Sequence, residues 1–487
     1  MKKRRAMSLM MATAIFCSMV PGAVVEAKSV QPSTQYEQMY TITSPYANVN
    51  WKKYGQYKAD FHAHSTNSDG GVLLKDTVED HYSKGYDILA MTDHNYLTES
   101  WSKGNNGITA KREKEIEKGK GRNKKGMIDI YQSEEQSLTD HINSFYAEFN
   151  NKQGATMAST IQSVQEAGGI THINHPGRYT GGKYGGENGI CASNDQATIK
   201  KYVDLFNAYS SCVGMEIVNK IDNESRCDRI LWDNILKETM PQGRFVWGFA
   251  NDDTHSINAT GYSFNMMLMP TLSREETRKA METGAFYSVS RVSRLDGINA
   301  SLPNGNDMPG SGNTDTLYLL NQTTPSISNI KVDDEENSIT IYGANYKEIE
   351  WIADGEVIAK GNTIDLNDYE DEIHSYVRAQ LKSSTGIAFT QPFGVEEKAP
   401  EKIKVKSVTR INKIADIRLK EKLGKKKNCV LLVSETGEEG SFTPYKKATF
   451  VGKDVIITGL SKKKTYYAYV AYVEGKTITK QSKLLRL

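Results

Sequence analysis

Cysteine is scarce in this chain of 487 residues: there are five, and no two of them form a Cys-x-x-Cys pair. Because that spacing is typical of structural zinc sites, its absence argues against a zinc-finger module. Cys17 lies in an apolar N-terminal segment. The other four, Cys191, Cys212, Cys227 and Cys429, are equally compatible with one or two disulfides and with buried thiols.

Long apolar runs are absent beyond the N-terminus. Residues 7–20 are apolar and follow four basic residues, and Val25-Glu26-Ala27 resembles a small-x-small cleavage site. The run is too short to span a bilayer comfortably, which favours a cleaved signal peptide over residues 1–27 rather than a membrane anchor. We therefore expect a soluble, secreted protein with no transmembrane anchor.

The charge is distributed unevenly. The whole chain has a formal net charge of +2, whereas residues 401–487 contain 21 Lys and Arg against 8 Asp and Glu, a net of +13, so the remainder is acidic. A basic C-terminal module predicts a polyanionic partner, such as an anionic cell-wall polymer. A basic surface that is merely solvated is the alternative.

The chain divides by pattern into an extension, an α/β region and two β-rich regions. Residues 28–57 show no clear period, whereas strand-like and helical segments alternate over 58–295. Short β-type runs follow over 296–397 and predict a β-sandwich. A second all-β domain is predicted over 401–487, where Gly459-Leu460-Ser461 and the following Tyr-rich strand resemble the late strands of a fibronectin type III domain.

Histidines and acids cluster in the α/β region. Eight of the nine histidines lie between His62 and His255, and most stand beside acids in short patterns at the ends of predicted strands. Parallel barrels place their active sites at that edge. The patterns are Asp60-Phe61-His62-Ala63-His64, Ser68-Asp69-Gly70, Thr92-Asp93-His94-Asn95, Glu134-Glu135 with His141, His172-Ile173-Asn174-His175-Pro176 and Asp253-Thr254-His255.

Imidazole and carboxylate together are what a hydrolytic site for Zn, Mn or Fe ions needs. His62 and His64 alternate along a strand and point the same way, so two imidazoles can meet one ion, and Asp60 could orient one of them. Carboxylates are natural bridges between neighbouring cations. Nine candidate ligands, enough for two or three ions, are His62, His64, Asp69, His94, Glu135, His141, His175, Asp253 and His255.

The motifs, in this order over residues 58–290, resemble those of the PHP (polymerase and histidinol phosphatase) family, particularly its CehA/McbA-like branch. The resemblance implies a distorted β/α barrel of about seven strands, a two- or three-ion site and phosphoester hydrolysis. The family's Gly-x-Glu pattern favours Glu135 over Glu134. The Asp-x-His spacing favours Asp253 over Asp252.

The leading hypothesis is an exported phosphoesterase acting on an anionic substrate, small or oligomeric. Arg178 could bind a phosphoryl oxygen with its planar fork, or pair with a loop acid instead; Lys220 is a weaker candidate for this role. One alternative is a carbamate, carboxylic ester or amide hydrolase of the same fold; another is a non-catalytic wall-binding protein. Of the other histidines, His81 is expected at the surface, and His172 is expected to pack or to orient a ligand.

Overall fold

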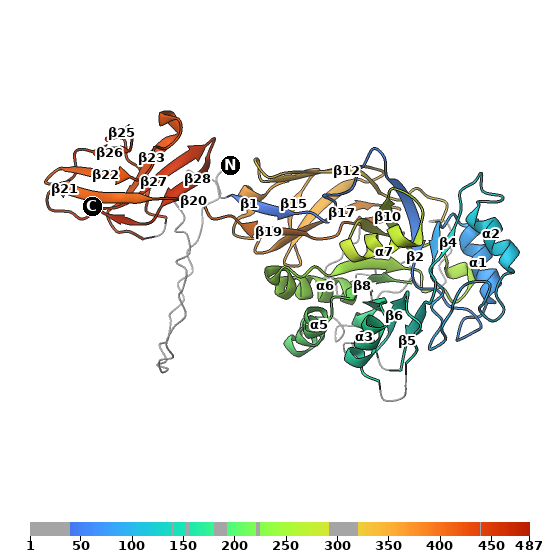
Figure 1. The fold of residues 1–487 in the computed structure, drawn as a ribbon. Helices are drawn as coiled ribbons and strands as arrows, with labels where there is room; N and C mark the ends of the chain where they lie inside the picture. The colour runs from blue at the N-terminus through green and yellow to red at the C-terminus, as the bar shows by residue number, and fades with distance from the viewer. Residues whose placement is uncertain are drawn as a thin grey trace. The chain divides into compact units, whose positions relative to one another are not determined.

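The computed structural model describes residues 39–138, 140–151, 155–179, 192–220, 225–291, 320–438 and 440–487 (Figure 1). Residues Gln38–Lys398 form one compact unit, and Ala399–Leu487 belong to a second. The predicted signal peptide and residues 28–38 of the predicted extension lie outside the described residues. Among the helices of the described residues, none is long and apolar enough to cross a membrane.

The larger sheet of the first unit is mixed. Its β2, β3 and β4 are parallel, whereas β10 runs antiparallel to β2 and leads through β11 into later strands of the chain. The eleven strands are β1 (Tyr40–Thr43), β2 (Gly55–Asp60), β3 (Ile88–Leu89), β4 (Ile128–Asp129), β10 (Ser263–Met269), β11 (Phe286–Ser290), β14 (Glu348–Ala353), β15 (Glu356–Lys360), β17 (Tyr376–Ser383), β18 (Gly386–Phe389) and β19 (Phe393–Glu397).

A second sheet of five strands lies in the same unit. Its strands are β5 (Glu134–Gln136), β6 (Ile142–Phe145), β7 (Ile170–Ile173), β8 (Cys212–Asn219) and β9 (Trp247–Asn251). The β7, β8 and β9 strands are parallel and buried along their whole length, which explains the mainly apolar sequences of β8 and β9.

Helices lie against both sheets. In Figure 1, α3 and α6 accompany the five-stranded sheet, and α7 lies beside β10. Local sequence sets their ends: Thr156 forms a capping box at the start of α3, and Gly284 adopts a left-handed conformation after α7. The helices are α1 (Leu74–Ser83), α2 (Ala110–Glu117), α3 (Met157–Glu166), α5 (Gln196–Ala208), α6 (Ser225–Thr239) and α7 (Arg274–Thr283).

The described strands do not show the predicted closed barrel of seven strands. They form two sheets instead, linked by isolated parallel bridges that pair Ala63 with Thr254 and His94 with Glu135. The connection from β5 to β6 is too short for a parallel crossover, so these strands pair antiparallel, as do β6 and β7. The candidate ligands gather where these bridges join the sheets, since Ala63 lies between His62 and His64, and Thr254 lies between Asp253 and His255.

The β-rich residues after the α/β region continue the large sheet. β18 pairs with β11, and β19 pairs with β1, so strands from residues 39–57, 58–291 and 376–397 share one sheet. The predicted boundary at residue 295 falls outside the described residues. A separate three-stranded sheet contains β12 (Ser326–Asp333), β13 (Ser338–Ala344) and β16 (Thr363–Asp365).

The second unit is a β-sandwich of a six-stranded and a four-stranded sheet around one apolar core, which includes Ile417, Leu431, Val455 and Val470. Its six-stranded sheet contains β20 (Glu401–Ile403), β23 (Cys429–Ser434), β24 (Thr443–Pro444), β27 (Tyr467–Glu474), β28 (Thr477–Ser482) and β29 (Leu485–Arg486). Its four-stranded sheet contains β21 (Val405–Ile411), β22 (Ile414–Leu419), β25 (Ala448–Val451) and β26 (Asp454–Ile457).

No disulfide joins any two of the described cysteines, Cys212, Cys227 and Cys429. Cys191 lies outside the described residues.

Candidate metal centre

The structure brings all nine predicted ligands into one cluster. His62 and His64 follow β2, His94 follows β3, His175 follows β7, and Asp253 and His255 follow β9, while Glu135 lies within β5. The imidazole rings form a continuous chain, in which neighbouring centroids lie 4.4–5.1 Å apart from His255 through His64, His94 and His141 to His175.

The floor of the cluster is buried. His62 Nε2 lies 3.1 Å from His64 Nε2, 3.2 Å from Glu135 Oε2 and 3.4 Å from Asp253 Oδ1. His175 Nε2 lies 3.6 Å from Glu135 Oε1. Asp253 and His175 hold their positions with positive φ angles of 46° and 26°, a conformation that is uncommon for residues other than glycine and that concentrates at functional sites.

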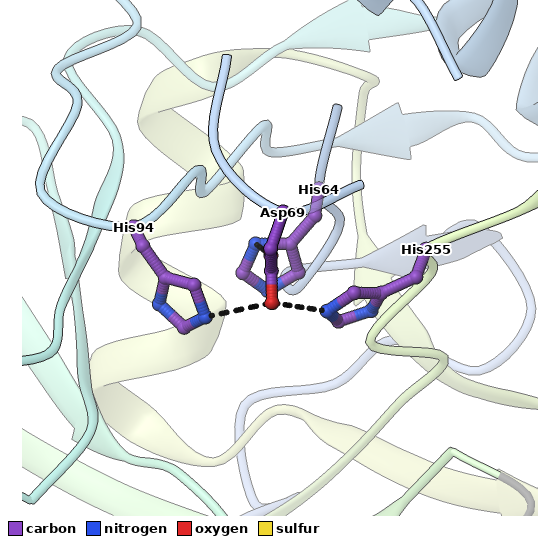
Figure 2. Close-up of side chains that lie close together, drawn as sticks. All are labelled: His64, Asp69, His94 and His255. Atoms are coloured by element: carbon purple, nitrogen blue, oxygen red, sulfur yellow. Dashed lines mark hydrogen bonds and ion pairs between the residues drawn. The ribbon is translucent and has the colours of Figure 1, made fainter. Parts of the chain in front are cut away.

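The rim of the cluster faces solvent. Figure 2 shows the Asp69 carboxylate between the rings of His94 and His255, with Oδ2 lying 3.6 Å from His94 Nε2 and 3.3 Å from His255 Nε2. The side chain of Asp69 is 56% exposed, and those of His94 and His255 are 22% and 29% exposed. The floor of the cluster is therefore shielded from solvent, whereas its rim is accessible, as entry of a substrate would require.

Glu135 is the common partner. Its two oxygens lie within 3.6 Å of five imidazoles, which makes it the residue best placed to bridge two cations. The contacts are Oε2 to His62 Nε2 at 3.2 Å, His64 Nε2 at 3.2 Å and His94 Nδ1 at 2.9 Å, and Oε1 to His141 Nδ1 at 2.8 Å and His175 Nε2 at 3.6 Å.

The electrostatics of the floor favour positive charge at its centre. Burial alone would lower the pKa of His62, but Asp253, Glu135 and Glu216 raise it well above its usual value. Burial alone would raise the pKa of Glu135, but the imidazoles around it, His62 first, hold it well below its usual range. Buried carboxylates that stay ionised in this way need compensating cations.

The donor set fits metal ions. Oε2 of Glu135 and Oδ1 of Asp253 are buried and receive no hydrogen bond of good geometry, although imidazole nitrogens lie close to both. Ligand atoms lie close enough together for four overlapping groups. These are His64, Asp69, His94 and His255; His62, Glu135 and His175; His62, His64 and Asp253; and His94, Glu135 and His141. Several divalent ions could share such a cluster through its carboxylates.

Sequence reasoning missed the buried residues that orient the ligands. Glu216 Oε1 accepts a hydrogen bond from His62 Nδ1 at 2.8 Å, which turns His62 Nε2 toward the centre. Asn174 Nδ2 donates to Glu135 Oε1 at 2.8 Å, and Asn251 Nδ2 donates to Glu216. The one local feature that distinguishes Glu216 is that it is an acid within the mainly apolar strand β8.

Two expectations about neighbouring residues were wrong. His81 is fully buried rather than at the surface, and its Nε2 lies 3.1 Å from Asp60 Oδ2. Asp60 therefore does not orient an imidazole of the His62 and His64 pair; it accepts hydrogen bonds from His81 and from the backbone N–H of His62.

Two other expectations, for His172 and for the choice between Glu134 and Glu135, agree with the structure. His172 packs between the rings of Phe145 and Phe249, and burial lowers its pKa to about 4. Glu135 rather than Glu134 contacts the site; no hydrogen bond reaches the buried carboxyl of Glu134 among the described residues.

Of the two side chains predicted to bind the substrate, Arg178 and Lys220, the structure describes that of Lys220. The backbone of Arg178 lies in the 3₁₀ turn η1 (Pro176–Tyr179), directly after His175, but its side chain lies outside the described residues. Lys220 Nζ lies 3.0 Å from Asp253 Oδ2, at the edge of the cluster.

No protein-family model matches the chain. A stretch of 61 residues is 43% identical to the DNA polymerase/3′-5′ exonuclease PolX of Bacillus subtilis (strain 168), covering 12% of this chain and 10% of that protein. The chain therefore spans about a tenth of the curated relative that it matches.

Solved structures give further similarities. A two-domain protein from Bacteroides vulgatus that contains a predicted PHP-like metal-dependent phosphoesterase is 13% identical, with 86% of this chain and 99% of that chain covered and a TM-score of 0.37. A two-domain fibronectin type III segment of chicken tenascin is 9% identical, with 34% and 95% covered and a TM-score of 0.14.

Proposed function

We propose that the protein is an exported, multinuclear metal-dependent phosphoesterase that hydrolyses a phosphomonoester or a phosphodiester by attack of an activated water. The observation that carries this proposal is the single cluster of six imidazoles and three carboxylates, in which Glu135 contacts five rings. Two or three divalent ions, Zn, Mn or Fe, bound there would supply Lewis acidity and lower the pKa of water toward neutrality.

The proposed role of each ligand residue depends on whether it lies in the floor or at the rim of the cluster. The floor, with His62, Glu135, His175 and Asp253, excludes solvent and fixes the ligand geometry. At the open rim, Asp69 and His255 border the side from which a substrate can enter. A rigid floor with an exposed rim suits hydrolysis, because the substrate and the attacking water both need access.

The substrate is proposed to be anionic. Lys220 Nζ supplies a positive charge beside Asp253, and Arg178, which follows His175 in the sequence, is proposed to bind a phosphoryl oxygen. Export is proposed from the basic and apolar pattern of residues 1–27.

A hydrolysis screen tests the proposal. The purified protein, reconstituted with Zn, Mn or Fe, is assayed on p-nitrophenyl phosphate, bis(p-nitrophenyl) phosphate and p-nitrophenyl acetate. We expect metal-dependent release from a phosphate ester, lost with a chelator and reduced at least about 100-fold by Glu135→Gln. Hydrolysis of the acetate alone would instead indicate the carboxylic ester or amide hydrolase, and a metal-loaded protein inactive on all three would contradict the phosphoesterase.

A further inference from the structure

The second unit carries a groove that is lined by lysine, aromatic and aliphatic side chains. The groove is a cavity of about 350 Å³ lined by residues of β23, β24 and β25 and the segments beside them. β24 is an edge strand of the six-stranded sheet, and β25 is an edge strand of the four-stranded sheet. Lys426 and Lys446 both line this cavity, which is called the basic groove below.

The charged residues that line the basic groove, Lys426 and Lys446, are both lysines. Residues 422–434 and 440–453 supply every lining residue, and these two segments contain seven lysines and no Asp or Glu. Elsewhere in the unit, Lys464 and Lys480 form ion pairs with acids. Among the residues that the structure describes, no carboxylate forms an ion pair with Lys426 or Lys446. Their ammonium groups are therefore available to an external anion.

Two aromatic side chains line the basic groove beside the lysines, and packing and a hydrogen bond hold them in position. Tyr445 and Phe450 line the basic groove and pack on the apolar core of the unit. The hydroxyl of Tyr445 donates to Thr458 O at 2.9 Å, which fixes the ring. The basic groove thus presents cations beside a rigid apolar surface, a combination that suits a chain in which charged groups alternate with carbon backbone or sugar rings.

From this arrangement we propose that the basic groove binds a linear acidic polymer, with Lys426 and Lys446 contacting its phosphate or carboxylate groups and the two aromatic rings contacting its carbon chain. A lipid surface is a poorer match, because the large apolar side chains exposed on this unit lie outside the groove. They are Ile411, Ile414, Val451, Ile456 and Leu484. The proposal does not depend on the reaction at the metal centre.

Binding measurements on the full chain test the proposal. Poly(glycerol phosphate) and polygalacturonate are titrated separately, so that the two arms distinguish a phosphate polymer from a carboxylate polymer. Lys426→Gln/Lys446→Gln should weaken binding at least about 10-fold and reduce the slope of log affinity against log salt by about two, one for each lost contact. The control Lys462→Gln/Lys463→Gln removes the same charge outside the groove and should stay within about threefold of the wild type.

Cys429 gives a second readout, because it lines the basic groove and is the one cysteine of residues 399–487. The bound polymer should slow alkylation of Cys429, followed by mass spectrometry of its peptide, in the wild type and in the control variant. Equal weakening in both double variants, or no protection of Cys429, would overturn the proposal. Failure to bind either polymer would also overturn it, as would equally tight binding of double-stranded DNA or anionic phosphatidylglycerol vesicles.

Discussion

Substitution of Glu216 gives a specific test of the candidate metal centre. The carboxylate of Glu216 contacts two of the predicted ligands, His62 and His175, but is not itself a predicted ligand. It is fully buried, and each of its oxygens accepts two hydrogen bonds. Oε1 accepts from His62 Nδ1 and Asn251 Nδ2, both at 2.8 Å, and Oε2 accepts from Asn219 Nδ2 at 2.8 Å and the His175 backbone N–H at 3.1 Å. Burial alone would raise the pKa of Glu216, but His62 and the other nearby histidines lower it, so the group is a carboxylate at neutral pH.

In Glu216→Gln an amide NH₂ replaces one acceptor oxygen and must face a donor. If that donor is His62 Nδ1, the ring moves its proton to Nε2, the atom that faces the other ligands, and metal binding there is blocked. Loss of such an orienting partner typically costs about 10- to 100-fold in metal affinity, equivalent to about 1.4–2.8 kcal/mol.

The assay is competition for Zn²⁺ against a fluorescent chelator, together with kcat/KM at saturating metal on whichever ester the wild type hydrolyses. Glu134→Gln is the matched control, because Glu134 is an equally buried acid beside Glu135 whose carboxyl makes no contact with the cluster. We expect weaker Zn²⁺ binding in Glu216→Gln and wild-type binding in Glu134→Gln. Affinities within about threefold for both variants would refute the orienting role.

Three further outcomes follow from particular contacts. Glu135→Gln should remove more than one ion per chain, measured by elemental analysis, because five imidazoles share this carboxylate. Burial raises the pKa of Glu134 to about 9 from 4.5, so the folded protein keeps a proton that the unfolded chain releases. Stability should fall between about pH 5 and 9, by on the order of 3 kcal/mol at pH 7, and Glu134→Gln should remove this component in urea titrations. Asp233→Asn should destabilise the first unit by about 3–5 kcal/mol in the same assay, because it leaves the fully buried Arg378 guanidinium, bound to Asp233 at 2.7 and 2.6 Å, without its counter-ion.

The ligands could be predicted from the sequence because local rules place them. His62 and His64 share a face by their spacing of two, and the ends of buried strands deliver the other motifs to the same region. Glu216 had no such pattern, since a lone acid in an apolar strand does not reveal which distant group it meets. His81 was misplaced for the same reason: its partner Asp60 lies 21 residues away and on another element.

The sheet arrangement was harder to predict than the site. Alternating strands and helices suggested a closed parallel barrel, but the β5–β6 hairpin and the antiparallel β10 break that order. The short β6 has no strand-like pattern, and the apolar sequence of β10 does not reveal that it runs antiparallel to β2. The pairing of β11 with β18 depends on contacts about a hundred residues apart, which local periodicity does not encode.

Metal content is the most direct test of the central claim. The purified protein is reconstituted with Zn, Mn or Fe and analysed by elemental mass spectrometry beside a His64→Ala/Asp253→Ala variant, with circular dichroism to verify that both are folded. We expect two or three ions per chain in the wild type and fewer in the variant. A folded wild type that holds no ion with any of the three metals would contradict a multinuclear hydrolase.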